Sequence, residues 1–178
     1  MIKCYDKRKK NKVAAKPFVK WAGGKGSLIS QLIENLPQNF AEQQNVTYIE
    51  PFVGGGAMLF YMLTNYPNIK RAVINDVNED LINSYLLIKN NPIKLIASLR
   101  EIKEEYYRLA TIETKSQYYY QMRDKYNNEE LAKEKRAACF MFLNKTCFNG
   151  LYRVNTSGKF NVPFGQYDHP NICDEELI

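Results

Sequence analysis

The chain has 178 residues, of which 45% are hydrophobic, enough to bury the core of one domain or of one domain with an insertion. Its formal net charge of +6 is concentrated at the start, because residues 1–20 carry eight basic side chains against one acid while the other 158 residues sum to −1. No run of about 18 apolar residues occurs, and no apolar segment follows the charged start. The sequence therefore predicts no membrane span and no signal peptide, and we expect a cytoplasmic protein.

Residues 1–16 are predicted to form a basic flexible tail. Two interpretations of this tail stay open. A basic arm can contact nucleic-acid phosphates, and it can equally be a solvated end without a partner.

Residues 17–92 have the pattern of a strand–helix–strand unit. A helix is expected over residues 28–36, and the segment 45–50 predicts a short buried strand. Three glycines starting at Gly54 then open a second helix. The strand KRAVIND ends at Asp76, and a third helix stops before Pro92. This order predicts a parallel sheet, and hence an α/β fold.

The glycines after the first strand would let a ligand approach the backbone closely. Asp76 lies 20 residues after Gly56, where an acid can hydrogen-bond ribose hydroxyls. The patterns of dinucleotide and P-loop sites are not met, and Glu50 would repel a pyrophosphate. A cationic nucleoside such as S-adenosylmethionine suits two acids better. The alternative is a tight turn with an acid that caps a helix.

Residues 93–146 are predicted to be helical throughout, in three segments. Cys139 and Cys147 lie in an apolar run and are expected to be core thiols. The four cysteines lack paired C-x-x-C spacing and the chain has one histidine, so the sequence predicts no metal site.

The stretch TCFNGLYRVNTSGKFNVPFGQY has no helical or strand period, and we expect an ordered loop or a β-hairpin. Its Arg and Asn side chains are of the types that contact base edges, and its aromatic side chains are of the type that stacks on bases. A polar loop that is held in place by buried aromatic residues would show the same composition.

Taken in this order, FVKWAGGKGSL, YIEPFVGGGAMLF, AVINDVNEDLI and FLNKTCFNGLYRVNTSGKFNVPFGQY resemble the N-terminal two-thirds of Dam-type DNA adenine methyltransferases. The resemblance implies an incomplete Rossmann-like methyltransferase sheet that binds S-adenosylmethionine in residues 17–92. It implies a mainly helical DNA-recognition insert with a hairpin loop in residues 93–167, and a return toward the catalytic part in residues 168–178. The implied reaction, typical of bacterial, phage and restriction-modification enzymes, moves a methyl group to the exocyclic amine of adenine in duplex DNA. A GATC-like site is expected.

The resemblance also implies roles for single residues. Arg153 would read a guanine edge, and Phe148 or Asn149 would lie near the space left by a flipped adenine. The residues that match the family's cofactor-binding positions are Trp21, Lys25, Glu50, Phe52, Gly54, Gly56 and Asp76. Those that match its DNA-binding positions are Phe148, Asn149, Leu151, Arg153, Asn155 and Pro163.

The sequence departs from this family in one respect, because it contains no Asp-Pro-Pro-Tyr motif. In the family that motif accepts the hydrogens of the adenine amine and stacks on the base. No catalytic residue is therefore assigned, and we expect residues 1–178 alone to be a truncated, inactive and weakly folded form. The alternatives are half of a split enzyme that is completed by a second chain, a non-catalytic DNA-binding module, and a nucleotide- or RNA-binding protein.

Overall fold

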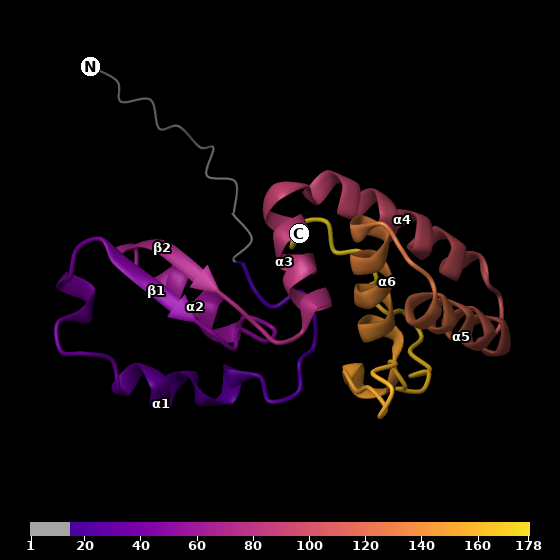
Figure 1. The fold of residues 1–178 in the computed structure, drawn as a ribbon, viewed down its shortest axis with the longest axis horizontal. Coiled ribbons are helices and arrows are strands. Elements are labelled where there is room, and N and C mark those ends of the chain that lie inside the picture. The colour runs from indigo at the N-terminus through magenta and orange to yellow at the C-terminus, as the bar shows by residue number, and fades with distance from the viewer. Residues whose placement is uncertain (1–14) are drawn as a thin grey trace, which may run out of the picture.

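The computed structural model describes residues 15–178, which form a small α/β part joined through helix α3 to a helical part (Figure 1). Residues 1–14 of the predicted basic tail lie outside the described residues, which include only its last two positions, Ala15 and Lys16. Within the described chain, no helix is long and apolar enough to cross a membrane.

The α/β part is a parallel strand–helix–strand unit, as the sequence predicts. Strand β1 (Val46–Glu50) pairs with strand β2 (Ile69–Ile74), and the helix between them is α2 (Ala57–Asn65). The short helix α1 (Ile29–Glu34) precedes them and continues a 3-10 turn over Lys25–Leu28. Because β1 and β2 are parallel, their carboxyl ends meet at one edge, where the glycine turn begins.

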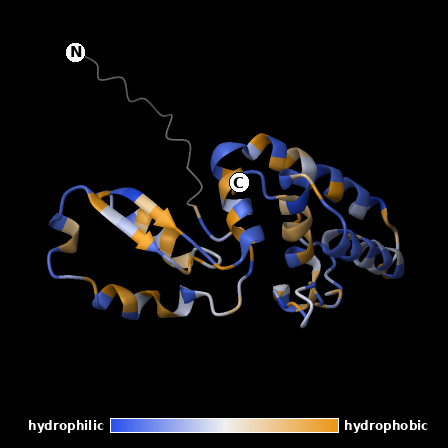
Figure 2. Cartoon of the chain, viewed as in Figure 1, coloured by the Kyte–Doolittle hydropathy of each residue, from blue (hydrophilic) through white to orange (hydrophobic). Residues whose placement is uncertain are grey.

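One face of this strand pair packs against α2 and the other is open. Met58 and Met62 of α2 form a small core with Ile69 at the start of β2. On the opposite face Ile49 is 65% exposed, and Val73 is exposed as well. Apolar residues of both strands are visible in Figure 2. The first strand, expected to be buried, therefore has one exposed apolar face, because alternate residues of a strand point to opposite sides.

Four longer helices complete the fold: α3 (Glu79–Asn90), α4 (Pro92–Arg108), α5 (Ile112–Asn128) and α6 (Lys133–Thr146). Their ends follow from local chemistry. The Asn78 side chain caps α3 by accepting from the Leu81 N–H, and Pro92 is tolerated because it begins α4. Thr111 forms a capping box at the start of α5.

Helix α6 lies at the centre of the helical part, against α3, α4 and α5 (Figure 1). Every residue from Ala137 to Asn144 is buried, so this helix is surrounded rather than amphipathic. Cys139 and Cys147 are buried free thiols, as expected, and Cys173 is buried too.

The segment after α6 is an ordered hairpin-like loop. Isolated bridges join Cys147 to Phe164 and Val154 to Phe160, which closes the chain on itself. Phe160, Val162 and Phe164 are buried, and they anchor the loop to the helices. The chain then returns along α4, where the Tyr107 hydroxyl donates to the Pro170 carbonyl, and residues 175–177 form a turn.

Candidate functional site

A cavity of about 660 Å³ lies between residues 17–26 and the glycine turn. Asp76 and Lys145 complete its wall. It opens at the carboxyl ends of β1 and β2, which is where open parallel sheets bind their ligands. Of the seven residues predicted to bind a cofactor, six line this cavity: Trp21, Lys25, Phe52, Gly54, Gly56 and Asp76.

The glycine turn lets an indole ring lie directly on the backbone. Gly54 has φ +52°, which is strained for other residues, and a Cβ at that position would lie 2.9 Å from Cδ1 of Trp21. Gly56 has φ +83°, and a side chain there would collide with the hydroxyl of Tyr85. The glycines are therefore needed both for the backbone conformation and for the close approach of two aromatic side chains.

Asp76 follows the carboxyl end of β2 and faces the glycine turn. Its Oδ2 accepts from the Gly54 N–H at 2.9 Å, and its Oδ1 accepts from the Asn78 N–H at 3.0 Å. A carboxylate offers about four acceptor positions, so two remain for hydroxyl groups of a ligand. The carboxylate is thus held in place and keeps acceptor positions for a ligand.

Glu50 is the predicted cofactor residue that does not line the cavity. It is 5% exposed, and its carboxylate accepts from Lys25 Nζ at 2.7 Å and from the Tyr48 hydroxyl at 2.8 Å. Lys25 Nζ also donates to the Phe52 carbonyl at 2.5 Å. Burial, then the hydrogen bond to Glu50 and the negative charge of that carboxylate, raises the pKa of the Tyr48 hydroxyl, which stays a donor. Glu50 therefore fixes Lys25 against the turn, and its direct contact with a cofactor stays a prediction.

The cavity wall is also joined to the loop after α6. The Trp21 ring stacks on Tyr152, with centroids 5.2 Å apart and planes at 22°. The buried Asn144 amide donates to the carbonyls of Lys20 and Gly150, at 2.8 and 3.0 Å, and its oxygen accepts from the Lys20 N–H at 2.9 Å. Residues 17–26 thus contact the glycine turn on one side and the loop on the other.

Sequence reasoning missed Lys20 and Lys145, which both line the cavity. Burial lowers the pKa of Lys145, Asp174 opposes this effect, and the positive charges of Lys20 and Lys16 add to it. Lys20 and Lys145 thus add positive charge to a cavity wall that also holds the Asp76 carboxylate. The available signal for Lys145 was its place as a basic residue shortly after the apolar run of residues 137–143.

The loop presents its predicted DNA-binding residues to solvent, and some are already held. Arg153 donates to the Asn161 side-chain oxygen at 2.7 Å and to its carbonyl at 3.2 Å. The Asn155 side chain accepts from the N–H groups of Ser157 and Lys159, so it shapes the turn at the tip. All six predicted residues are exposed: Phe148, Asn149, Leu151, Arg153, Asn155 and Pro163.

The cavity, which contains the Asp76 carboxylate and several lysines, thus adjoins the exposed loop, which carries arginine and asparagine side chains. Aromatic residues lie in both. A family model matches residues 21–178 and is described as D12 class N6 adenine-specific DNA methyltransferase.

Curated relatives agree with that match. A type II methyltransferase, M.MjaIII, of Methanocaldococcus jannaschii is 49% identical over 165 residues, 92% of this chain and 56% of the relative. Another, M1.LlaDCHI of Lactococcus lactis subsp. cremoris, is 38% identical over 95% of this chain and 54% of its own length. The DNA adenine methylase of Escherichia coli K12 is 35% identical over 90% and 51%. The chain spans about half the length of these relatives.

Proposed function

Because this chain belongs to the D12 class of N6 adenine-specific DNA methyltransferases, we propose that it binds S-adenosylmethionine in the cavity and duplex DNA on the adjoining loop. The convergence of six family-matched residues on one cavity carries the proposal. In the same proposal, β1 and β2 belong to a Rossmann-like sheet, and the protein acts on DNA in the cytoplasm of a bacterial or phage system.

The cofactor's groups fit the charges of the wall. Asp76 would accept from the ribose hydroxyls, and Gly54 and Gly56 would let the methionine side lie against the backbone. Trp21 and Phe52 supply apolar surface, and Lys25, which already donates to Glu50 and to the Phe52 carbonyl, has a third Nζ hydrogen that could donate to the carboxylate. Bound there, S-adenosylmethionine supplies an electrophilic methyl group.

The loop would read the duplex. The planar guanidinium of Arg153 can contact a guanine edge with two hydrogen bonds. Phe148 is exposed, and it could fill the space left by an adenine turned out of the stack. A GATC-like site is part of this proposal.

The transfer step needs groups that this sequence does not contain. The adenine amine is a poor nucleophile, because its lone pair is delocalised into the ring. In the family, Asp-Pro-Pro-Tyr accepts its hydrogens and aligns the base. We propose that residues 1–178 bind both ligands, and that transfer requires this motif from additional polypeptide, in cis or from a second chain. The alternative is a non-catalytic DNA-binding module that uses the exposed loop.

Isothermal titration with S-adenosylmethionine tests the cofactor site. We expect the 178-residue chain to bind it, and Asp76→Asn to weaken binding by about tenfold, since one charge-assisted hydrogen-bond acceptor is lost. Asp124→Asn on the exposed side of α5 is the control and should leave the affinity unchanged. Equal affinity in the Asp76 variant and the parent would contradict the site.

The same preparation tests whether residues 1–178 bind the cofactor without transferring its methyl group. It should not transfer tritiated methyl groups to adenine-containing duplex DNA. Transfer in proportion to the concentration of the chain would show that the Asp-Pro-Pro-Tyr groups are dispensable.

A further inference from the structure

The backbone of Gly54 is held at both ends by side chains. Its N–H donates to Asp76 Oδ2 at 2.9 Å, and its carbonyl accepts from the Tyr85 hydroxyl at 3.0 Å. The residue has φ +52° in a turn that the Gly56 N–H closes by donating to the Val53 carbonyl at 3.0 Å, and the two side-chain bonds add a further constraint on the orientation of its peptide groups.

Tyr85 is itself firmly placed. It lies in α3, whose N-cap Asn78 donates its N–H to Asp76, so the helix, the acid and the turn share one set of contacts. The side chain is 8% exposed, and its ring meets Phe18 edge-on with centroids 4.9 Å apart. The hydroxyl therefore cannot move away from Gly54 without displacing core residues.

The hydroxyl also remains a donor. Burial, followed by the negative charges of Glu50 and Asp76, raises the pKa of Tyr85 above its ordinary value. In addition, the hydroxyl occupies the space that a side chain at Gly56 would need. Tyr85 thus contacts both glycines that shape the turn, although it does not line the cavity.

We propose that Tyr85 is a positioning residue of the cofactor site and acts through Gly54. Its hydroxyl fixes the Gly54 carbonyl, which orients the following peptide and keeps the Gly54 N–H on Asp76. Without the hydroxyl the partly buried Gly54 carbonyl loses its side-chain partner, the turn shifts, and Asp76, the carboxylate proposed to hold the ribose, is displaced from its position. This inference rests on the proposed cofactor role of the cavity.

The isosteric change Tyr85→Phe tests it, with Tyr119→Phe as the matched control. The Tyr119 hydroxyl is buried and donates to the Val162 carbonyl at 2.7 Å, and neither residue lines the cavity. Both changes remove a hydrogen bond from a buried tyrosine to a backbone carbonyl, so both should lower the thermal midpoint. We expect Tyr85→Phe alone to raise the dissociation constant for S-adenosylmethionine, by about 5- to 30-fold, and Tyr119→Phe to leave it within about twofold.

Hydrogen exchange of the Gly54 amide gives a second readout without ligand. Tyr85→Phe should speed this exchange by about tenfold, because the Gly54 N–H···Asp76 bond opens more often, whereas Tyr119→Phe should not. If the parent chain binds the cofactor and Tyr85→Phe binds it equally, the inference is overturned, whatever happens to stability. If the parent does not bind it, the proposed function fails, and unchanged Gly54 exchange would overturn the positioning role independently.

Discussion

Single residues in the cavity serve more than one contact, and this limits what can replace them. Gly54 needs a left-handed backbone, lies under the Trp21 ring and bonds both Asp76 and Tyr85. Lys25 neutralises Glu50 and reaches the Phe52 carbonyl. A family signature in the sequence therefore reflects a network of short contacts as well as ligand binding.

The proposed base contact of Arg153 can be tested by substitution. Its guanidinium is exposed and is held by Asn161, so its orientation is partly set before any duplex arrives. Arg153→Ala is expected to reduce the preference for the cognate site by about 10- to 100-fold over a duplex with that guanine replaced, since one bidentate base contact is worth about 1–3 kcal/mol.

Competition binding with paired duplexes at fixed salt measures this preference. Arg108→Ala, on the exposed end of α4, is the control and should change neither duplex. Equal loss of affinity for both duplexes in Arg153→Ala would mean that Arg153 contacts phosphates instead of a base.

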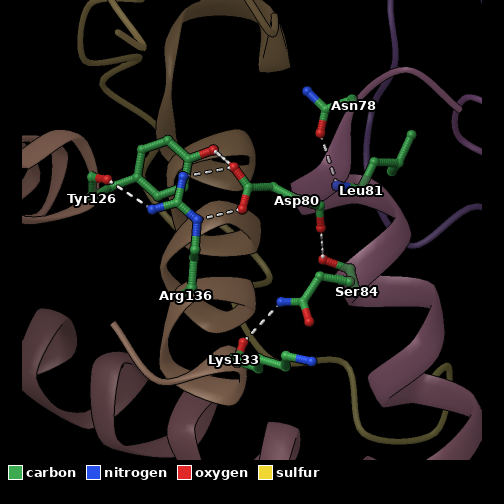
Figure 3. A network of polar contacts seen from close by, with 8 residues as sticks. Asn78, Asp80, Leu81, Ser84, Tyr126, Lys133 and Arg136 are labelled. Carbon is green, nitrogen blue, oxygen red and sulfur yellow. Dashed lines mark hydrogen bonds and ion pairs between the residues drawn. The ribbon is translucent and has the colours of Figure 1, made fainter. Parts of the chain in front are cut away.

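At the scale of elements, a polar network joins α3 to α5 and α6 (Figure 3). Arg136 pairs with both oxygens of Asp80, at 2.5 and 2.9 Å, and donates to the Tyr126 carbonyl. The Tyr126 hydroxyl also donates to Asp80, and the guanidinium lies over the Tyr126 ring. The network fixes α3, which bears both Tyr85 and the Asn78 cap, against the helical part.

Arg136→Met should therefore destabilise the fold. Removing one partner of a buried pair costs about 3–5 kcal/mol, but the Arg136 side chain is 36% exposed, so we expect about 1–3 kcal/mol. The pair Arg108–Glu104 is the control, because both side chains are mostly exposed, and Arg108→Met should cost less than about 0.5 kcal/mol. Urea unfolding measures both, and equal costs would contradict the assigned role.

The elements themselves were largely predictable, because they depend on local patterns. Apolar periodicity, Pro92 and the glycines gave the strands and helices, and the alternation of strand and helix gave the parallel pair. Asn144 and Tyr85 could not be found in that way. The Asn144 bond to Lys20 spans 124 residues, and the Tyr85 bond to Gly54 spans 31. Such contacts depend on how the two parts pack, which no local pattern encodes.

For the whole molecule, the buried thiols and phenols predict a loss of stability in alkali. Burial raises the pKa of Cys147 to about 11, and of Cys139 and Tyr106 to about 12. A folded-state pKa above the unfolded value means that the stabilisation is complete below about pH 9 and disappears as the pH rises toward 12.

Urea midpoints between pH 7 and pH 11 measure this effect. They should fall above about pH 9, and the fall should be less steep in Cys139→Ala, which removes one buried ionisable group. A midpoint that stays constant to pH 11 would mean that these groups ionise equally in the folded and unfolded chain.

Amide NMR spectra of the chain with and without S-adenosylmethionine test whether the cofactor binds where residues 17–26 contact the glycine turn. We expect the cofactor to shift the signals of the Trp21 indole N–H and of the amides of Gly54, Gly56 and Asp76, and to leave residues of α5 unchanged. Saturable binding that shifts other residues and leaves these four in place would contradict it.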